Sequence, residues 1–322
     1  MKNNSEHIIE RHINKLDWTM PPHNLYEPIQ YIMSQGGKRI RPQLCLLSAG
    51  LFGGDEQKAI YPAVAFELLH NFTLLHDDIM DNAPLRRGKE TVYKKWNANI
   101  AILSGDALFA KSYEYLLGYQ GKELPALVLL LTKTAIEICE GQQMDLDFEE
   151  EKKVEIPQYL TMIRLKTAVM LAACLKAGAI VSSASEKEQQ LIYDFGIKTG
   201  LAFQIQDDLL DVYADTNKFG KHTGGDIAEN KKTFMSLKSM ELAKGDDLKR
   251  LHHYFSSINF DKEEKFTAVK SIYDKYNVKE EAYSLINQYY TDAIGILQQI
   301  NAPQPSKQTL IDFVERLMER VC

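Results

Sequence analysis

Proline is absent between Pro157 and Pro303, so no residue of that long stretch forces a helix to end. Apolar residues recur at helical spacing there and elsewhere, and few segments alternate as strands do. Pro157 itself suits the first turn of a helix. Helices are predicted near residues 6–16, 24–35, 42–50, 56–81, 98–118, 122–147, 157–181, 186–214, 232–243, 245–256, 260–275, 278–299 and 307–320. We expect an all-α chain, and one domain over residues 1–322, because no linker or composition shift interrupts the helices.

Composition excludes several classes of protein. Hydrophobic residues make up 45% and charged residues 25% of the 322 residues, which is typical of a soluble globular chain. The formal charge of −6 disfavours a nucleic-acid partner or an anionic membrane surface. No secretory signal is predicted, and the apolar run at 168–175 is far shorter than the roughly 20 residues of a transmembrane helix. The cysteines are widely spaced without a CxxC pair, which predicts reduced thiols in a cytoplasmic protein: Cys45, Cys139, Cys174 and Cys322.

One acidic pattern occurs twice. LLHDDIMD (74–81) and QIQDDLLD (204–211) each carry Asp-Asp-x-x-Asp in an apolar helical context. Asp77 and Asp81 then lie one helical turn apart, as do Asp207 and Asp211, and two carboxylates about 5.5 Å apart repel by about 3 kcal/mol. We expect these carboxylates to be largely buried and therefore to need a hard cation, and Mg²⁺ prefers carboxylates together with phosphate oxygens. A solvated acidic helix face, or a helix end that happens to carry acids, would explain one motif but fits two copies poorly; the calcium-loop spacing is absent.

Basic residues gather near the first motif. GGKRIRP (36–42) supplies Lys38, Arg39 and Arg41, and Arg86 and Arg87 follow Asp81. Each cation alone is more often a surface residue, but arginine forks match phosphate oxygens, and the clustering beside an acidic motif favours a diphosphate site.

Four further features remain open on spacing alone. His70 lies on the helical stripe of Asp77 and is either a satisfied core residue or a donor to an anion. Lys166, followed by Thr167, either extends to the surface or lines a site. Gln204 shares a face with the second motif. The segment 215–233, with Lys221 and Lys231, is a surface loop or a flap that closes over phosphates.

These motifs together resemble the trans-isoprenyl diphosphate synthase, or polyprenyl synthetase, family, and the likeness runs from GGKRIRP to ENKKT. The resemblance implies an isoprenoid-synthase helical bundle around a deep central cavity, with the two acidic motifs facing each other, and a homodimer. It assigns magnesium to Asp77, Asp81, Asp207 and, more weakly, Asp211. The implied isopentenyl diphosphate residues are Lys38, Arg41, His70 and Arg87. The implied allylic diphosphate residues are Arg86, Lys166, Thr167, Gln204, Lys221 and Lys231, and Gln142 and Asp145 would line the cavity.

The implied reaction joins isopentenyl diphosphate to an allylic diphosphate, namely dimethylallyl, geranyl or farnesyl diphosphate. Three Mg²⁺ ions and the cations would draw diphosphate off the allylic substrate. The double bond of isopentenyl diphosphate would then attack the carbocation, and a proton would leave, to the released diphosphate.

Product length is predicted from the residues upstream of the first motif. In the family, bulk at the position of Phe72 limits chain growth, and Phe72 precedes Asp77 by five residues. Thr73 is smaller than the aromatic residue found there in animal and yeast farnesyl synthases. The sequence therefore predicts a fifteen- or twenty-carbon product and leaves farnesyl and geranylgeranyl diphosphate tied.

Two other functions were weighed. A class I terpene cyclase shares the implied fold and the first motif, but it usually lacks the second Asp-rich motif and a separate isopentenyl diphosphate site. A non-catalytic partner subunit of a heteromeric prenyl synthase typically loses one acidic motif. Both motifs and GGKRIRP are intact here, which favours the synthase.

Overall fold

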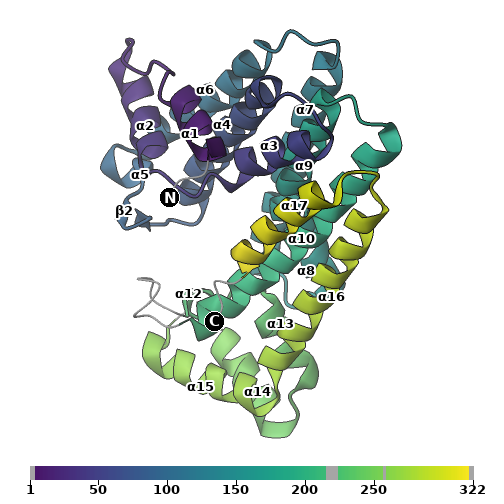
Figure 1. Cartoon of the computed structure of the whole chain (residues 1–322). Helices are drawn as coiled ribbons and strands as arrows, with labels where there is room; N and C mark the ends of the chain where they lie inside the picture. Colours follow the sequence, from purple (N-terminus) through teal and green to yellow (C-terminus); the bar gives the residue numbers. More distant parts are fainter. Residues whose placement is uncertain (1–3, 215–223, 257–258, 319–322) are drawn as a thin grey trace. The chain divides into compact units, whose positions relative to one another are not determined.

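The structure is a computed structural model that describes residues 4–214, 224–256 and 259–318 (Figure 1). Helices form almost all of its regular structure, so the all-α prediction is confirmed. The helices are α1 (Asn4–Ile13), α2 (His23–Ser34), α3 (Ile40–Leu51), α4 (Glu56–Met80), α5 (Val92–Lys95), α6 (Ala98–Leu116), α7 (Leu124–Glu150), α8 (Ile156–Ile163), the π-helical turn η1 (Arg164–Ala168), α9 (Val169–Val181), α10 (Glu186–Tyr213), α12 (Gly225–Ala228), α13 (Phe234–Leu242), α14 (Gly245–Phe255), α15 (Lys262–Lys275), α16 (Val278–Gln299) and α17 (Gln304–Met318).

A short β-hairpin that the sequence analysis missed follows α4. Strands β1 (Leu85–Arg86) and β2 (Lys89–Glu90) are antiparallel, with Leu85 opposite Glu90 and Arg86 opposite Lys89. The two turn residues, Arg87 and Gly88, have φ of 53° and 75°. Two successive residues at positive φ suit the right-handed twist of a tight hairpin. The turn therefore fixes the backbone positions of Arg86 and Arg87.

The chain divides into two compact units, each described by itself. The first contains the described residues of Met1–Ala135, Ala173–Tyr193 and Asn301–Leu310. The second contains those of Ile136–Ala172, Asp194–Ile300 and Ile311–Cys322. The first acidic motif lies in the first unit and the second motif in the second. A single domain, a central cavity and motifs that face each other all stay predictions.

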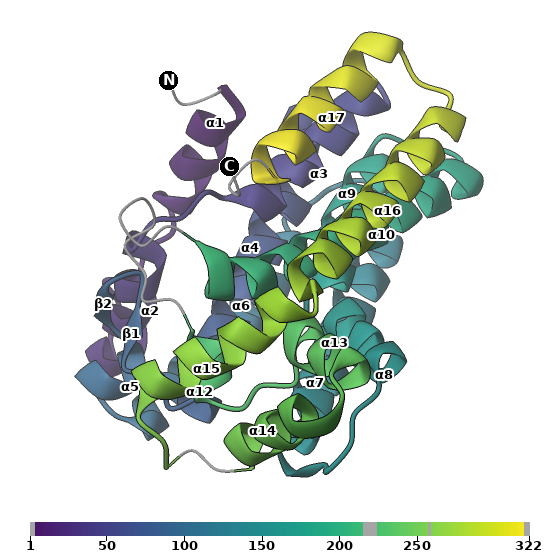
Figure 2. The same ribbon diagram turned by 90° about the horizontal axis from the view of Figure 1, so that it is seen from below.

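Helix α4 is the central helix of the first unit. Its residues 63–69 are all buried, so the helix is covered on every side there. It packs against α1, α3, α5 and α6, and Figure 2 shows it between α3 and α6. The Asp55 carboxylate caps its start by accepting from the Gln57 amide at 2.8 Å. The helix ends at Met80, and its last turn carries the first acidic motif.

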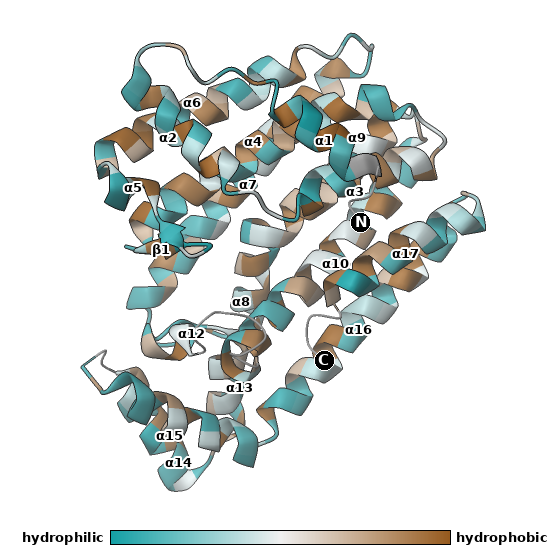
Figure 3. Ribbon diagram, turned by 60° about the vertical axis from the view of Figure 1, so that its left-hand side comes forward, coloured by the Kyte–Doolittle hydropathy of each residue, from teal (hydrophilic) through white to brown (hydrophobic). Residues whose placement is uncertain are grey.

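The second unit is built around a core shared by α8, α10, α13, α15 and α16. Tyr159 and Tyr273 are both 1% exposed in this core. Pro157 does lie in the first turn of a helix, α8, as predicted, beside a capping box made by Glu155 and Gln158. Helices α14 and α15 are coloured largely hydrophilic in Figure 3, consistent with a position at the edge of this core.

Helix α9 is a strongly apolar helix. It has only 13 residues, whereas a helix needs about 20 to span a bilayer. Its apolar side chains are buried within the protein, among them Val169, Leu171 and Cys174. None of the described helices is both long and apolar enough to cross a membrane.

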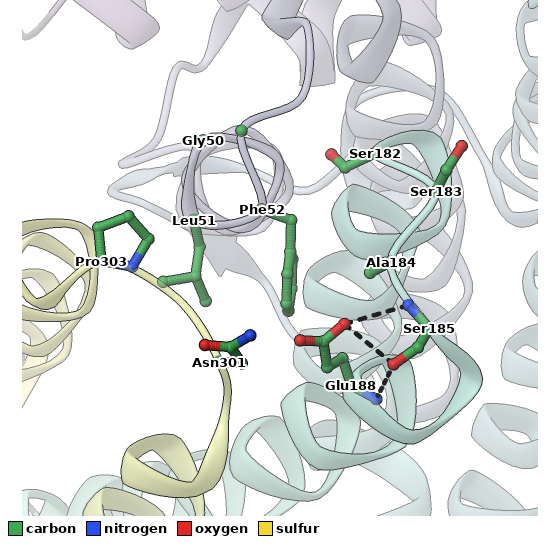
Figure 4. Close-up of a pocket in the computed structure, with 11 residues that line it drawn as sticks. Gly50, Leu51, Phe52, Ser182, Ser183, Ala184, Ser185, Glu188, Asn301 and Pro303 are labelled. Carbon is green, nitrogen blue, oxygen red and sulfur yellow. Dashed lines mark hydrogen bonds between the residues drawn. The ribbon is translucent and has the colours of Figure 1, made fainter.

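A pocket of about 380 Å³ in the first unit lies where α10 begins (Figure 4). The backbone amide and the hydroxyl of Ser185 both donate to the Glu188 carboxylate, at 3.2 and 2.9 Å. The Glu188 amide donates to the Ser185 hydroxyl at 3.3 Å. These groups satisfy one another as the start of a helix. We therefore regard the pocket as part of the scaffold.

Candidate active site

The first acidic motif occupies the end of α4. Asp77 is half-buried, Asp78 is 1% exposed, and Asp81 follows the helix and is exposed. The Asp81 amide donates to the Asp77 carbonyl at 2.8 Å, which keeps the two residues one turn apart. The outer aspartates are thus more accessible than the sequence analysis expected, because the motif lies at a helix end rather than in its interior.

The middle aspartate of this motif binds an arginine. Arg86 Nε donates to both oxygens of Asp78 at 2.9 and 3.0 Å, and its Nη2 lies 2.7 Å from Oδ1. Burial raises the pKa of Asp78, and the guanidinium opposes that rise. This bidentate pair anchors the hairpin to α4. Arg86 was predicted to hold the allylic diphosphate, and that role stays a prediction.

Several arginines lie near His70. Burial lowers the pKa of His70 well below its ordinary value, and Arg41, Arg87, Arg86 and Arg39 lower it further. The imidazole is therefore neutral at pH 7 and can donate one N–H to an anion. The structure thus brings together three of the predicted isopentenyl diphosphate residues, His70, Arg41 and Arg87. A cation cluster in a chain of net charge −6 is the environment that an anionic ligand requires.

The loop before α3 is held against the hairpin turn. Arg87 donates through Nη1 to the Gly36 carbonyl. A Cβ on Gly37, whose φ is 143°, would lie 3.0 Å from the same guanidinium. Glycine is therefore required at Gly37 both for its backbone conformation and for this close approach. Lys38 and Arg41 lie just after this contact.

The second acidic motif shows the same division between middle and outer aspartates. Asp207 is exposed and Asp211 half-buried, whereas Asp208 is 5% exposed. Asp208 accepts from the Tyr159 hydroxyl, from Gln204 Nε2 at 3.2 Å and from the Phe234 amide at 3.2 Å. Burial raises the pKa of Asp208 to about 7, and these hydrogen bonds oppose the rise. The middle aspartate therefore joins α8, α10 and α13.

Asp211 is bound by the start of α12 and by Gly224, the residue before it. Its Oδ2 accepts from the Asp226 amide at 3.0 Å, and its carbonyl accepts from the Gly224 amide at 2.7 Å. Burial raises the pKa of Asp211, and burial together with Asp211 and Asp208 raises that of Asp226. Three carboxylates, those of Asp208, Asp211 and Asp226, therefore act on one another's charge in this region.

Lys166 and Thr167 lie on the π-helical turn η1, which interrupts the single helix predicted over 157–181. Helix α7 approaches this turn closely, because a Cβ on Gly141 would be 2.4 Å from the Lys166 amide nitrogen. The backbones of α7 and η1 touch there, and π turns frequently occur at functional sites. Lys166 Nζ donates to Asp145 at 2.5 Å. Two residues predicted separately are thus a pair.

A hydrogen-bond relay links this turn to the second motif. Thr167 Oγ1 donates to Gln204 Oε1 at 3.0 Å, and Gln204 in turn donates to Asp208.

Gln142, the other predicted cavity residue, lies three residues before Asp145 on α7 and is 7% exposed. Within the described residues, neither its side-chain Nε2 nor its Oε1 has a protein partner. A buried amide without partners is unusual and points to a ligand or water.

Of the two predicted flap lysines, Lys221 lies outside the described residues. Lys231 follows Asn230, whose φ is 61°, and its amide donates to the Asp226 carbonyl at 2.9 Å. Its Nζ lies 3.5 Å from Glu229. Asn230 is in turn held by Lys265, a lysine only 1% exposed that donates to the Asn230 side chain.

Of the two predicted chain-length residues, Phe72 lies on the side of α4 that meets α6. The Phe72 ring packs against Phe109 at 5.2 Å and against His76 at 4.7 Å between ring centroids. Phe109 continues the cluster to Tyr113 at 5.3 Å. The Thr73 hydroxyl donates to the His70 carbonyl at 2.8 Å, so it is satisfied within its own helix. Phe72 is therefore part of an aromatic layer between two helices.

Both motifs offer carboxylate oxygens, the donors that a hard cation prefers. No group of three or more His, Cys, Asp or Glu side chains in the described ranges is arranged to hold an ion by itself. Mg²⁺ usually takes one or two carboxylates and completes its shell with water and substrate phosphates. The residues present fit that requirement.

Sequence reasoning missed the buried residues that hydrogen-bond to the site residues and fix their positions. Asp78 and Asp208 were visible in the motifs, but nothing marked them as buried anchors. Tyr159, Asp226 and Lys265 carried no signal, because their roles depend on contacts distant in sequence.

Comparison with known proteins identifies the family. A family model described as polyprenyl synthetase matches residues 22–275. A geranylgeranyl diphosphate synthase from Sulfolobus acidocaldarius is 39% identical over 301 residues, which cover 91% of this chain and 90% of that protein. The crystal structure of a geranylgeranyl pyrophosphate synthase is 42% identical, covers 100% of both chains and has a TM-score of 0.94. A polyprenyl synthase from Caulobacter crescentus, solved with calcium and isoprenyl diphosphate, is 26% identical with a TM-score of 0.87 over 99% of this chain and 95% of that one.

The chain belongs to the polyprenyl synthetase family. It is a prenyltransferase with the all-α isoprenoid-synthase fold, and its relatives place it among the short-chain prenyl diphosphate synthases. The family resemblance drawn from the motifs is thereby confirmed.

Proposed function

We propose that this prenyltransferase condenses isopentenyl diphosphate with an allylic diphosphate and makes geranylgeranyl diphosphate as its main product. One observation carries the proposed chemistry: Arg86 binds Asp78 of the first acidic motif, and Arg87 of the same hairpin binds the Gly36 carbonyl of the basic loop, so cations and carboxylates lie side by side. Farnesyl and geranylgeranyl diphosphate were tied on sequence alone. The names of the relative from Sulfolobus acidocaldarius and of the solved synthase favour the twenty-carbon product.

Each of the two substrates has its own group of binding residues in this proposal. In our proposal Lys38, Arg41, His70 and Arg87 hold isopentenyl diphosphate, supported by the loop–hairpin contact in the first unit. Arg86, Lys166, Thr167, Gln204, Lys221 and Lys231 serve the allylic substrate, and Gln142 and Asp145 line the cavity. The relay from Thr167 through Gln204 to Asp208 supports this, because it fixes the Gln204 amide in one orientation.

Magnesium is the proposed cofactor, held by Asp77 and Asp81 in one motif and by Asp207 and Asp211 in the other. The accessible outer aspartates and the oxygen-only donor set support it. Bound magnesium would neutralise charge on the departing diphosphate. We propose three ions with substrate present, and the calcium in the Caulobacter crescentus enzyme supports a divalent ion.

The proposed reaction breaks the C–O bond of the allylic diphosphate. The electron pair leaves with the diphosphate, which the arginines and lysines receive. The double bond of isopentenyl diphosphate then forms the new C–C bond, and the proton that restores a double bond goes to the released diphosphate. The residues of this chain bind and orient; none forms a covalent bond to substrate.

We also propose a homodimer in the cytoplasm. Large apolar side chains are exposed on and beside α6 and on α7: Ile102 at 41%, Leu103 at 59%, Leu117 at 57% and Leu129 at 55%. Apolar residues gathered on an exposed surface mark interaction sites, and a second copy of the chain is the proposed partner. Cys45 and Cys174 are buried, and burial raises the pKa of both thiols, which suits reduced cysteines.

One assay tests the function and separates its rivals. Pure protein is incubated with labelled isopentenyl diphosphate, an allylic primer and MgCl₂, and the products are extracted, dephosphorylated and chromatographed. A labelled twenty-carbon alcohol is expected. A cyclic hydrocarbon with released diphosphate would indicate a terpene cyclase, and no turnover would indicate a non-catalytic subunit.

A further inference from the structure

One cation of the basic loop does not face outward. Arg39 is 5% exposed, although Lys38 and Arg41 stand on either side of it in GGKRIRP. All three nitrogens of its fork have partners. Nη1 donates to Glu67 at 2.7 Å, Nε to Glu10 at 3.0 Å, and Nη2 to the Met33 carbonyl at 3.0 Å. These bonds use three of the five N–H donors of the guanidinium, and at 5% exposure the side chain is enclosed by protein groups rather than presented to a substrate phosphate.

The backbone at Arg39 is as unusual as its side chain. Its φ of 45° lies in the left-handed region, which a long side chain seldom adopts. It is the residue before α3, and its carbonyl accepts from the Gln43 amide at 3.1 Å. Such a conformation persists only where surrounding contacts determine it. The two carboxylates and the Met33 carbonyl are those contacts.

The partners of Arg39 come from three helices of the first unit, because Met33 lies on α2 and the two carboxylates lie on α1 and α4. Glu67 is 4% exposed in the buried part of α4, one turn before Asn71, whose side-chain amide donates to the Glu67 carbonyl at 2.8 Å. Glu10 lies on α1 and is half-buried. Helix α1 also contacts α3, because Gln43 on α3 donates to Glu6 at 3.4 Å, and the same amide donates to the Lys38 carbonyl of the loop at 2.6 Å.

We propose that Arg39, clamped by Glu10 and Glu67, is a positioning residue that fixes Lys38 and Arg41 for the diphosphate of isopentenyl diphosphate. Helix α1, which the family model does not cover, thereby forms part of that substrate's site. The two carboxylates also neutralise Arg39, so the loop presents its cations without a third charge repelling them. This inference rests on the proposed function, in which Lys38 and Arg41 bind isopentenyl diphosphate.

The test compares Glu10→Gln, Arg39→Lys and Arg11→Gln with the unchanged protein. Glu10→Gln removes one charge from the clamp at its more exposed end, and Arg39→Lys keeps the charge but loses the fork. Arg11 is exposed on the same helix and serves as the control. Steady-state kinetics give kcat and separate KM values for isopentenyl diphosphate and the allylic primer, and calorimetric titration gives the Kd of isopentenyl diphosphate alone.

Losing a charge-assisted hydrogen bond should raise the KM and the Kd for isopentenyl diphosphate about tenfold in Glu10→Gln. The KM of the primer and kcat should stay within about twofold, and Arg11→Gln should match the unchanged protein. Arg39→Lys should show the same selective loss. An unchanged KM for isopentenyl diphosphate, or equal losses toward both substrates, would overturn the inference while leaving the proposed function standing. If the unchanged protein neither binds nor turns over isopentenyl diphosphate, the proposed function fails first.

Discussion

At the scale of single residues, each acidic motif contains aspartates of two kinds. The middle ones, Asp78 and Asp208, are buried and bound by protein donors. The outer ones are more exposed and therefore available to ions. The spacing of the aspartates predicted the two acidic motifs but not the difference between middle and outer aspartates. The middle aspartates contact Arg86 and Tyr159, and no local sequence pattern reveals these contacts.

Asp77→Ala should lower kcat about a hundredfold or more while leaving helicity unchanged, because it removes a proposed magnesium ligand from an accessible position. The measurement is turnover of labelled isopentenyl diphosphate, with circular dichroism at 222 nm as the check on folding. Asp246→Ala, in the first turn of α14, is the control and should retain full activity. Full activity in Asp77→Ala would falsify the metal assignment.

His70 should make stability depend on pH. Burial and the neighbouring arginines hold the pKa of His70 well below the ordinary value. Below about pH 6.5, His70 is therefore protonated in the unfolded chain but stays neutral in the folded chain. The resulting contribution lowers the free energy of unfolding as pH falls, by at most about 1.4 kcal/mol per pH unit. Urea denaturation at pH 7.5 and 5.5 measures it, and His70→Gln should lose this part of the dependence. Identical pH dependence in both proteins would contradict the assignment.

At the scale of elements, hydrophobic periodicity predicted most helices and several of their ends. The helix predicted over 157–181 begins at Ile156 with Pro157 in its first turn, but its interruption by η1 was not predicted, and neither was the close approach of α7 to that turn at Gly141. The hairpin at 85–90 was missed because two-residue strands leave no alternation to detect. Local signals therefore predict elements, whereas close contacts between elements decide where they bend.

Gly141→Ala should destabilise the protein by about 1–3 kcal/mol and reduce kcat, because the added methyl meets the backbone of the turn that carries Lys166. Gly295→Ala on α16 is the matched control. Nothing lies within 4 Å of a Cβ there, so helix propensity should make it neutral or stabilising by up to about 1 kcal/mol. Thermal denaturation of both variants measures the difference. Similar melting temperatures would show that α7 and η1 do not touch as described.

Phe72→Ala should lengthen the product by at least one isoprene unit, because it opens the aromatic layer between α4 and α6. Chromatography of the dephosphorylated products measures the shift. Phe260→Ala removes a partly buried ring from another aromatic cluster and should leave the product unchanged. If both variants give the original product, Phe72 does not limit chain growth.

At the scale of the whole molecule, the sequence was enough for the fold class and the family. Apolar spacing predicted helices, and the combination of two acidic motifs with GGKRIRP predicted a prenyl diphosphate synthase, as the relatives confirm. Assembly is less accessible to such reasoning, because a helix face that binds a second copy has the same apolar pattern as an ordinary core face. The exposed apolar residues on α6 support the proposed homodimer.

Leu103→Glu should convert a dimer into a monomer. Leu103 is 59% exposed on α6, and a carboxylate buried there in each copy would be left unpaired. Light scattering coupled to size-exclusion chromatography should give twice the chain mass of 36.8 kDa for the unchanged protein and one chain mass for the variant. Lys249→Glu, on the exposed side of α14, also adds a negative charge and should stay dimeric. A monomeric unchanged protein would remove the homodimer from the proposal, whereas a dimeric Leu103→Glu would move the interface away from this face of α6.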